Sequence, residues 1–336
     1  MAKVIVTNDP VGINAVTHSG NFQADDVFAA ARLASTSLIP YTIFRTRDEN
    51  MLSKFKEVFD IVVFDVGGEY DPEMKNFDHH QNPRPERLSG LPWSSFGLIT
   101  TEEQNPDSML CCHIDSIDNG VKGYPAPMAW QEAIQIVGEE CKIAFNGKPP
   151  SIGWLIHMCN PCHLDGSRVQ LQEFSIRFET LVNYLIENVF DEHGFEKSFH
   201  PREIAEFFIP YVLFNKYAEE ESRNRVTDCV NSCIGEILVL DQYEPAALDV
   251  VAEGDNGILY IVYPGPSDWM VQQVAAKPGS FEGRKPLPEA WAGKRGKELA
   301  DLTGVQDAVF CHNNRFIGGA RSRVGAILLA QLAVAA

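Results

Sequence analysis

The first 120 residues alternate short apolar runs with segments of helical periodicity, and this alternation constrains the fold more than any other feature. Residues 3–8 (KVIVTN), 41–47 (YTIFRTR) and 60–68 (DIVVFDVGG) have the length and composition of strands. Residues 25–35 (DDVFAAARLAS) follow a helical pattern that begins with two acidic residues, where they favour the helix dipole. Strands that alternate with helices are typical of a mostly parallel sheet flanked by helices. We therefore predict an α/β fold.

The rest of the chain has a helical part and a mixed part. Residues 128–225 are mostly helical, whereas residues 235–241 (GEILVLD) and 257–264 (GILYIVYP) return to the strand pattern. A chain of 336 residues is long enough for two domains, at roughly 150 residues for each. We predict one domain over residues 1–225, which includes the helical segment, and a smaller α/β domain over residues 226–336.

The composition is that of a compact globular protein, with 45% hydrophobic and 22% charged residues. No run of about 18 apolar residues is present, and the first ten residues lack the apolar core of a secretory signal, so neither a membrane span nor export is expected. The eight cysteines are scattered and are expected to be free thiols. These features favour a cytoplasmic location, or an organelle or the nucleus in a eukaryotic cell.

The net charge of −18 argues against a large nucleic-acid-binding groove, because phosphate binding recruits clustered Lys and Arg. The charge is unevenly distributed, however. Residues 277–336 carry nine basic and five acidic side chains. An acidic body with a basic C-terminal part is compatible with metal-binding carboxylates in one region and a phosphate-binding surface in another.

Three motifs rich in Asp and His are expected at strand ends in the N-terminal part. They are residues 18–26 (HSGNFQADD), Asp65 directly after an apolar strand, and residues 78–80 (DHH). In open α/β sheets the ligand crevice lies outside the carboxyl ends of the strands, so these motifs are predicted to converge. Carboxylates and imidazoles suit Mn²⁺ or Mg²⁺, in one or two sites, and a carboxylate such as Asp65 can bridge two ions. The chemistry this favours is phosphoryl displacement by metal-activated water.

Each motif also has an ordinary structural interpretation. A His-His pair after an aspartate is frequently just a loop. Asp25 and Asp26 suit the start of a helix without any further role. The functional interpretation depends on the three motifs occurring together at successive strand ends.

Longer strings in both halves resemble the melanocyte-proliferating-gene (MYG) family, a branch of the DHH phosphoesterase superfamily. In order, they are THSGNFQADDVFAAA, RTRD, DVGGEYDPEMKNFDHHQ, SIDNG, WMVQQV, GSFEGRKPLPEAWAGKRGKEL and RFIGGARSRVGA. The resemblance implies a DHH-type catalytic domain over residues 1–225, a substrate-binding domain over residues 226–336, Mn²⁺ or Mg²⁺ as cofactor, and 3′-to-5′ exonuclease activity on RNA. RNA or short oligonucleotides are then the expected partners, and a homodimer is left open.

The resemblance also assigns roles to individual residues. Carried over by motif, the metal ligands are His18, Asp25, Asp65, His79 and Asp118. Catalytic roles fall on His80, close to the scissile phosphate, on the bridging Asp65, and on Asp78, which is expected to orient its neighbours. Asp115 is the alternative to Asp118. The family's first motif carries a second histidine where this chain has Gln23, and because an amide is a poorer ligand, one metal position is expected to be weakened.

A second group of candidates is predicted to bind substrate. Gly318 and Gly319 resemble the glycine-rich substrate loop of DHH enzymes, in which backbone N–H groups approach a phosphate. The basic candidates around them are His312, Arg315, Arg321, Arg323, Arg284 and Lys285. The alternative is that the glycines only form a turn and the arginines are solvated.

Other features and functions were weighed against this hypothesis. Cys159 and Cys162 have the spacing of a haem-attachment site or half of a zinc site. The missing export signal argues against haem, and the missing second pair of ligands argues against zinc. Arg45 and Arg47 suit either a phosphate or a structural ion pair. Two alternative functions are hydrolysis of small phosphorylated molecules, such as pyrophosphate or short oligonucleotides, and a catalytically weakened RNA- or protein-binding module that results from Gln23.

Overall fold

In the computed structural model the chain has two α/β units, so the predicted fold class is confirmed. The structure describes residues 3–101, 104–145, 151–265, 267–278, 280 and 282–336. The first unit contains residues 1–161 and 169–214, and the second contains residues 162–168 and 215–336. The long helix α8 (Pro201–Ser232) begins in the first unit and ends in the second, and the predicted boundary at residue 225 lies inside it.

A six-stranded sheet forms the centre of the first unit. Its order is β1 (Val4–Thr7), β3 (Tyr41–Arg45), β2 (Ala15–Thr17), β4 (Val62–Phe64), β6 (Asn76–Phe77) and β5 (Tyr70–Asp71). Every pair is parallel except β5 with β6. The mostly parallel sheet was predicted, but β2 was not, because three residues are too few to show a periodic pattern.

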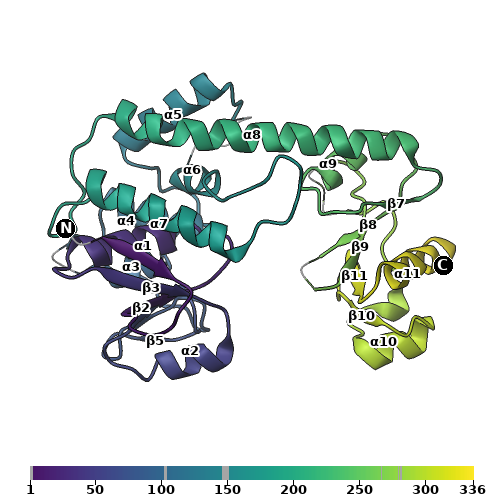
Figure 1. Ribbon diagram of the computed structural model, residues 1–336, viewed down its shortest axis with the longest axis horizontal. Coiled ribbons are helices and arrows are strands. Elements are labelled where there is room, and N and C mark those ends of the chain that lie inside the picture. The colour runs from purple at the N-terminus through teal and green to yellow at the C-terminus, as the bar shows by residue number, and fades with distance from the viewer. Residues whose placement is uncertain (1–2, 102–103, 146–150, 266, 279, 281) are drawn as a thin grey trace. The chain divides into compact units, whose positions relative to one another are not determined.

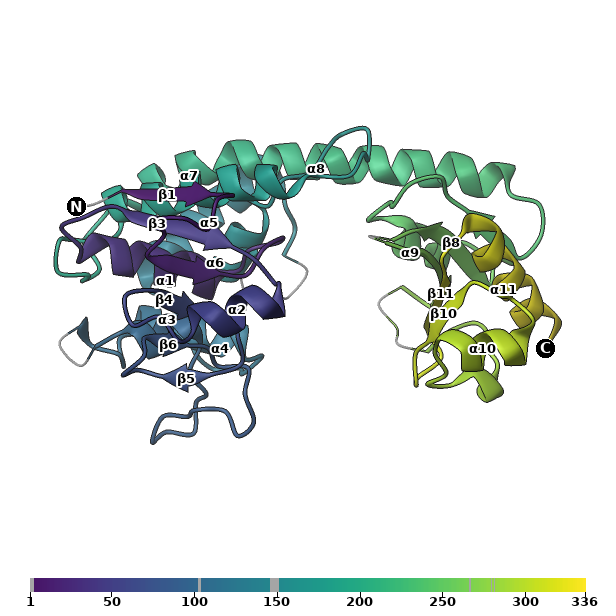
Figure 2. The ribbon, with the colours of Figure 1, turned by 60° about the horizontal axis from the view of Figure 1, so that its bottom comes forward.

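The two faces of this sheet are covered differently because successive side chains point to opposite sides. Val16, Phe44 and Val63 face α2 (Glu49–Phe55) and pack with its Leu52. The opposite face packs against the helical layer in a much larger core. That layer contains α1 (Ala24–Ser35), α3 (Ser95–Ile99), α4 (Met109–Asp118), α5 (Met128–Cys141), α6 (Ile152–His157) and α7 (Leu171–Asn188). Figures 1 and 2 show these helices on one side of the sheet and α2 on the other.

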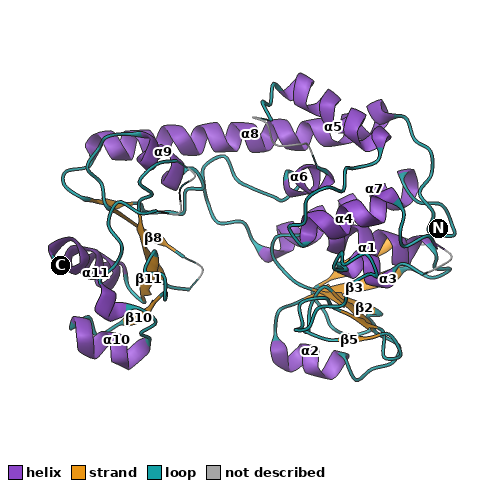
Figure 3. Cartoon of the chain, turned by 180° about the vertical axis from the view of Figure 1, so that it is seen from behind, coloured by secondary structure: helices purple, strands orange, loops and turns teal. Residues whose placement is uncertain are grey.

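The second unit is a smaller α/β domain, as predicted. Its sheet has the order β10 (Ala308–Cys311), β11 (Ile317–Ala320), β9 (Trp269–Gln273), β8 (Tyr260–Pro264) and β7 (Ile237–Val239), with only β7 and β8 parallel. One face packs against α11 (Arg323–Ala335) and α10 (Gly296–Thr303), and the other against α9 (Ala247–Glu253). Figure 3 shows the helices on either side of this sheet. Among the described residues, no helix is both long and apolar enough to cross a bilayer.

Candidate metal centre

Adjacent strands deliver the motifs of the first unit to one place. β2, β4 and β6 are neighbours in the sheet, and their carboxyl ends lead into His18, Asp65 and the Asp78-His79-His80 segment. The first turn of α1 adds Asp25 and Asp26, and the last residue of α4 is Asp118. The sequence-predicted ligands therefore come together in space.

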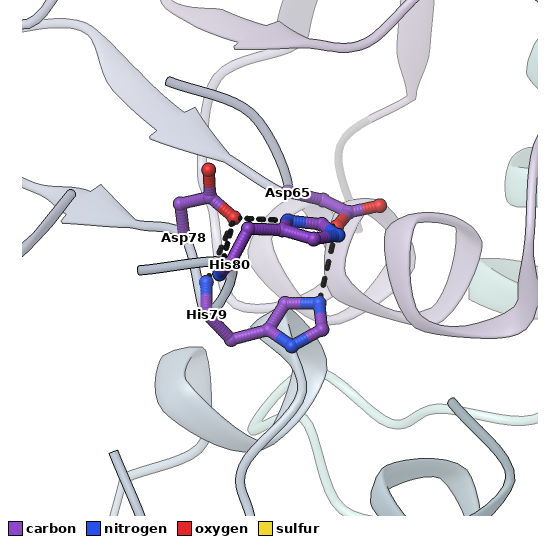
Figure 4. Close-up of side chains that lie close together, drawn as sticks. All are labelled: Asp65, Asp78, His79 and His80. Atoms are coloured by element: carbon purple, nitrogen blue, oxygen red, sulfur yellow. Dashed lines mark hydrogen bonds and ion pairs between the residues drawn. The ribbon is translucent and has the colours of Figure 1, made fainter. Parts of the chain in front are cut away.

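Asp65 lies at the centre of the cluster. Its Oδ2 is 3.1 Å from His18 Nε2, and its Oδ1 is 3.4 Å from His79 Nε2. Figure 4 shows this carboxylate facing the histidine pair. The backbone of Asp65 has a φ of 53°, a left-handed conformation that is uncommon outside glycine and that aspartate tolerates better than most residues. A strained residue directly after a buried strand points to a constraint on where this carboxylate must lie.

Two further carboxylates complete the arrangement on the His79 side. His79 Nε2 is 3.2 Å from Asp118 Oδ2 and 3.6 Å from Asp25 Oδ2. On the other side, His18 Nε2 is 3.1 Å from Asp26 Oδ2. The cluster thus contains a group made by His18, Asp26 and Asp65 and a neighbouring group made by Asp25, His79 and Asp118.

Many polar atoms of this cluster are buried without a well-formed hydrogen bond in the described part of the chain. The carboxylate atoms are both oxygens of Asp25, Oδ2 of Asp26, Oδ1 of Asp65 and Oδ2 of Asp118. Both ring nitrogens of His79 share this condition. Buried polar atoms are nearly always hydrogen-bonded, because an unsatisfied one costs about 1–3 kcal/mol. Their convergence fits a divalent cation, which satisfies several carboxylate and imidazole atoms together.

The electrostatics of the cluster also favour a cation. Burial and the neighbouring carboxylate of Asp65 raise the pKa of Asp25 well above its usual range, and burial raises the pKa of Asp118 to about 6. Burial alone would lower the pKa of His18, but the carboxylates of Asp26 and Asp65 raise it to about 9. The cluster therefore retains protons as compensation for its negative charge, and a bound cation would provide the same compensation.

Asp78 holds the histidine pair in place. Its Oδ1 accepts hydrogen bonds from the backbone N–H groups of His79 (2.8 Å) and His80 (3.2 Å), and it lies 2.6 Å from His80 Nδ1. Its Oδ2 accepts from the N–H of Gly68. The side chain of His80 is 61% exposed, whereas His79 is buried. These contacts hold the backbone of both histidines and the imidazole of His80 (Figure 4).

The structure separates Asp115 from the cluster. Asp115 is fully buried, where it pairs with Arg87 and accepts hydrogen bonds from the backbone N–H and the hydroxyl of Ser94. Its oxygens are therefore already satisfied by protein groups. Asp118, one helical turn later, is the residue that faces His79.

Asp26 is the member of the cluster that sequence reasoning did not assign as a ligand. The helix-start interpretation was sufficient to explain an acidic residue at this position. The available signal was the pair of adjacent acidic residues. Adjacent positions in the first turn of a helix point in different directions, so the two carboxylates can face different partners. Asp25 consequently faces His79, while Asp26 faces His18.

Gln23 is the N-terminal capping residue of α1, and Gln23 and Asp118 both line a pocket of about 290 Å³. The two arginines after β3 have different environments. Arg45 is buried, pairs with Asp26 at 3.7 Å and stacks on Phe178, so its role is structural. Arg47 is exposed and places Nη2 2.9 Å from His18 Nδ1, at the edge of the cluster.

The glycine pair in the second unit lies within a strand. Gly318 and Gly319 belong to β11, between β9 and β10, whereas a loop was expected. A Cβ at Gly318 would lie 3.0 Å from the Phe310 carbonyl oxygen, and one at Gly319 would lie 3.0 Å from the Trp269 carbonyl oxygen. Close backbone packing therefore explains both glycines without a phosphate.

The basic candidates of the second unit divide into two kinds. Arg284 donates to the carbonyl oxygens of residues 251, 254 and 258, and Lys285 donates to that of Val334, so both charges are used within the fold. Arg323 pairs with Asp241 at 2.9 Å, and Arg315 is partly buried. His312 and Arg321 are exposed, and in the described part of the chain Arg321 makes no ion pair.

The two cysteines with haem-like spacing do not form a metal site in the described residues. Cys159 is buried in the core of the first unit, whereas Cys162 lies 3.4 Å from the side-chain oxygen of Asn215. Between them, Asn160 bonds both the N–H and the carbonyl of Phe22, at 2.9 and 3.0 Å. This segment therefore anchors the loop before α1.

Comparison with known protein families shows which family this chain belongs to. A model of the MYG1 exonuclease family, described as an uncharacterised protein family (UPF0160), matches residues 14–102 and 104–334. The chain belongs to the MYG1 family. The predicted resemblance is thereby confirmed.

Curated MYG1 relatives align over nearly the whole chain. The MYG1 protein of Dictyostelium discoideum is 28% identical over 350 residues, which cover 94% of this chain and 94% of that protein. The MYG1 exonuclease of Homo sapiens is 29% identical over 360 residues, which cover 95% of this chain and 85% of that protein.

Solved structures give more distant likenesses. The exonuclease RecJ bound to manganese has a TM-score of 0.46 at 11% identity, covering 95% of this chain and 90% of that one. The pGpG-specific phosphodiesterase PggH from Vibrio has a TM-score of 0.43 at 14% identity, covering 96% of this chain and 99% of that one.

Proposed function

We propose that this MYG1-family protein is a metal-dependent phosphodiester hydrolase that acts as a 3′-to-5′ exonuclease on RNA. The observation that carries the proposal is the convergence of unsatisfied carboxylate oxygens and imidazole nitrogens around Asp65 and His79. Membership of a family in which the human and mouse relatives are named exonucleases supports the reaction class. The preference for RNA and the direction come from the family resemblance and need the experiments below.

In this proposal Mn²⁺ or Mg²⁺ is held by His18, Asp25, Asp65, His79 and Asp118, with Asp26 as a further ligand. When bound, the ions supply positive charge against the phosphate and lower the pKa of water near neutral pH. Asp78 positions the histidine pair by its bonds to both backbone N–H groups. The His80 imidazole is largely exposed beside the cluster, and Asp78 raises its pKa, so that it can donate a proton or hydrogen bond to a phosphate oxygen.

Arg47 adds a cation at the edge of the same cluster. Its guanidinium is exposed and lies beside His18, in a site otherwise dominated by carboxylates. Guanidinium groups bind phosphate oxygens in a planar, two-bond geometry. In the proposal Arg47 attracts the phosphodiester to the cluster. Arg321, His312 and Arg315 of the second unit are proposed, separately, to bind RNA phosphates.

The test uses one RNA labelled at its 5′ end and the same RNA labelled at its 3′ end. Purified protein is incubated with each, in MnCl₂, in MgCl₂ and in EDTA. The proposal expects metal-dependent release of mononucleotides: the 3′ label appears at once as a mononucleotide, while the 5′-labelled RNA shortens gradually. His79→Ala should abolish release, and His193→Ala, which removes an exposed histidine elsewhere in the first unit, should not. Release of the 5′ label first would contradict the direction, and equal release in EDTA would contradict the metal requirement.

A second candidate is hydrolysis of short phosphorylated molecules. The net charge of −18 and the small size of the pocket beside Asp118 favour it. Rates measured on RNAs of two to twenty nucleotides, and on pyrophosphate, distinguish the candidates. A kcat/KM that is highest for the dinucleotide and falls with length would select the second candidate.

A further inference from the structure

The pocket beside the metal cluster has walls from three separate segments. They are the start of α1, the end of α4 and helix α6, and the lining residues are Phe22, Gln23, Ala24, Ile117, Asp118, Ser151, Gly153 and His157. Asp118 is shared between pocket and cluster, because its Oδ2 lies 3.2 Å from His79 Nε2. A molecule in this pocket would therefore be adjacent to a phosphate held at the cluster.

The walls are fixed to one another by buried hydrogen bonds. Asn160, which follows α6, bonds both the N–H and the carbonyl of Phe22. His113 in α4 accepts from the backbone N–H of Ile152 at 3.3 Å through Nε2, and its Nδ1 lies 2.8 Å from the carbonyl oxygen of Tyr124. These bonds hold α6 against both other walls. The pocket is consequently a preformed feature and needs little rearrangement to bind a ligand.

The lining combines apolar and polar residues. The apolar part includes Ala24, Ile117 and Gly153, and a Cβ at Gly153 would approach Ile117 Cδ1 to 2.9 Å. Gln23, Ser151 and the exposed His157 offer an amide, a hydroxyl and an imidazole. Oδ2 of Asp118 makes no hydrogen bond in the described chain, and only 9% of that side chain is exposed. With Asp118 engaged at the metal cluster, the apolar residues together with the amide, the hydroxyl and the imidazole suit a nucleoside, which offers a base and ribose hydroxyl groups.

The size of the pocket limits what it can accept. Its volume of about 290 Å³ lies at the lower end of the roughly 300–1,000 Å³ that is typical of small-molecule sites. A space of this volume accommodates about one nucleoside. We propose that the pocket binds the nucleoside of the terminal residue of the substrate, with its phosphate at the metal cluster. This inference rests on the proposed function and adds the part of the substrate that the first unit recognises.

The binding experiment uses the full chain with MnCl₂ and adenosine 5′-monophosphate in a calorimetric titration, with ribose 5-phosphate for comparison. The nucleotide should bind at least about tenfold more tightly than the sugar phosphate, because only the nucleotide carries a base that the pocket can contact. Gly153→Leu fills the pocket and should reduce nucleotide affinity by at least about tenfold, a loss on the order of 1.4 kcal/mol. Sugar phosphate affinity should change less than twofold.

A second variant removes a polar group without filling space. His157→Ala should weaken nucleotide binding by up to about tenfold, the value of one hydrogen bond, whereas the matched His193→Ala should have no effect. Mn²⁺ titration of each variant checks that the metal cluster is intact. Equal affinities for nucleotide and sugar phosphate, or wild-type nucleotide affinity in both pocket variants, would overturn the inference.

Hydrolysis separates this inference from the proposed function. Bis(4-nitrophenyl) phosphate needs the metal cluster but carries no nucleoside, whereas a dinucleotide needs both. In Gly153→Leu, KM for the dinucleotide should rise about tenfold while kcat/KM for the nitrophenyl ester changes less than twofold. If the wild-type protein cleaves the ester and the variant cleaves both substrates normally, the pocket assignment is wrong and the hydrolase stands. If the wild-type protein cleaves neither substrate, the hydrolase proposal fails, and the pocket assignment fails with it.

Discussion

The backbone N–H of Gln23 donates to Oδ1 of Asp26 at 2.8 Å, and this bond leaves Oδ2 of Asp26 facing His18 at 3.1 Å. Gln23 thus contributes to the cluster through its backbone, which any residue at this position can do. What the glutamine changes is a side chain in the pocket that Asp118 also lines, where we expect a histidine to offer the metal a nitrogen ligand.

Gln23→His is therefore expected to strengthen metal binding. An added imidazole should increase Mn²⁺ affinity about tenfold, equivalent to about 1.4 kcal/mol. Calorimetric titration with MnCl₂ measures this, and Gln135→His, on the exposed face of α5, is the matched control. If Gln23→His neither tightens Mn²⁺ binding nor raises turnover, the weakening attributed to Gln23 is wrong.

Removal of the metal should destabilise the first unit. A ligand that binds only the folded state stabilises it by about 2.7 kcal/mol at a concentration one hundred times its Kd. Urea unfolding in MnCl₂ and in EDTA should differ by about this amount for the wild-type protein, and the difference should disappear in His79→Ala. His193→Ala should keep it. An unchanged midpoint on addition of EDTA to the wild-type protein would exclude a structural contribution from the ion.

The metal-free protein should lose stability as the pH rises from about 6.5 to about 9. Asp26 and Asp65 raise the pKa of His18 to about 9, so the folded state holds a proton that the unfolded state releases near pH 6.5. This contribution, on the order of 2–3 kcal/mol, is complete below pH 6.5 and is lost as the pH rises through the folded-state pKa. Urea unfolding in EDTA across this range tests it, and His18→Gln should flatten the profile. A wild-type stability that increases with pH in EDTA would contradict the charge balance described for the cluster.

Asp115 and Asp118 should respond differently to substitution although they are one helical turn apart. Asp115→Ala removes the buried partner of Arg87 and leaves it only the ion pair with the exposed Asp107, which should cost about 3 kcal/mol of stability. Asp118→Ala removes a carboxylate that the fold does not otherwise use, so it should reduce Mn²⁺ affinity with a smaller effect on the metal-free protein. Urea unfolding in EDTA, combined with Mn²⁺ titration, compares the two. The opposite pattern would restore Asp115 as the ligand.

Arg284 and Arg321 should also separate into a structural and a binding residue. Arg284→Ala removes bonds to several carbonyl oxygens at the end of α9 and should destabilise the protein by about 3 kcal/mol. Arg321→Ala leaves stability nearly unchanged and should lower the salt dependence of RNA binding by about 0.7, the value for one phosphate contact on a single strand. Filter binding from 50 to 200 mM salt measures this slope. An unchanged slope in Arg321→Ala supports the view that this arginine is only solvated.

Much of the fold was predictable because its signals are local. Apolar runs such as Val62–Phe64 and the periodicity of residues 25–35 each report on a few neighbouring residues, and the parallel sheet follows from their alternation. β2 escaped prediction because its three residues are a strand only through pairing with β3 and β4. Its short length hid the element that leads directly into His18.

The sequence by itself determined the α/β class, the family and the Asp and His residues at strand ends, because these depend on residue type and order along the chain. Only the tertiary structure decided which oxygen faces which imidazole. In the folded chain Asp26 faces His18, Asp115 pairs with Arg87, and Arg284 donates to backbone carbonyl oxygens. The reason is physical: a carboxylate or guanidinium takes its role from the groups that surround it in space, and those groups come from segments far apart in sequence.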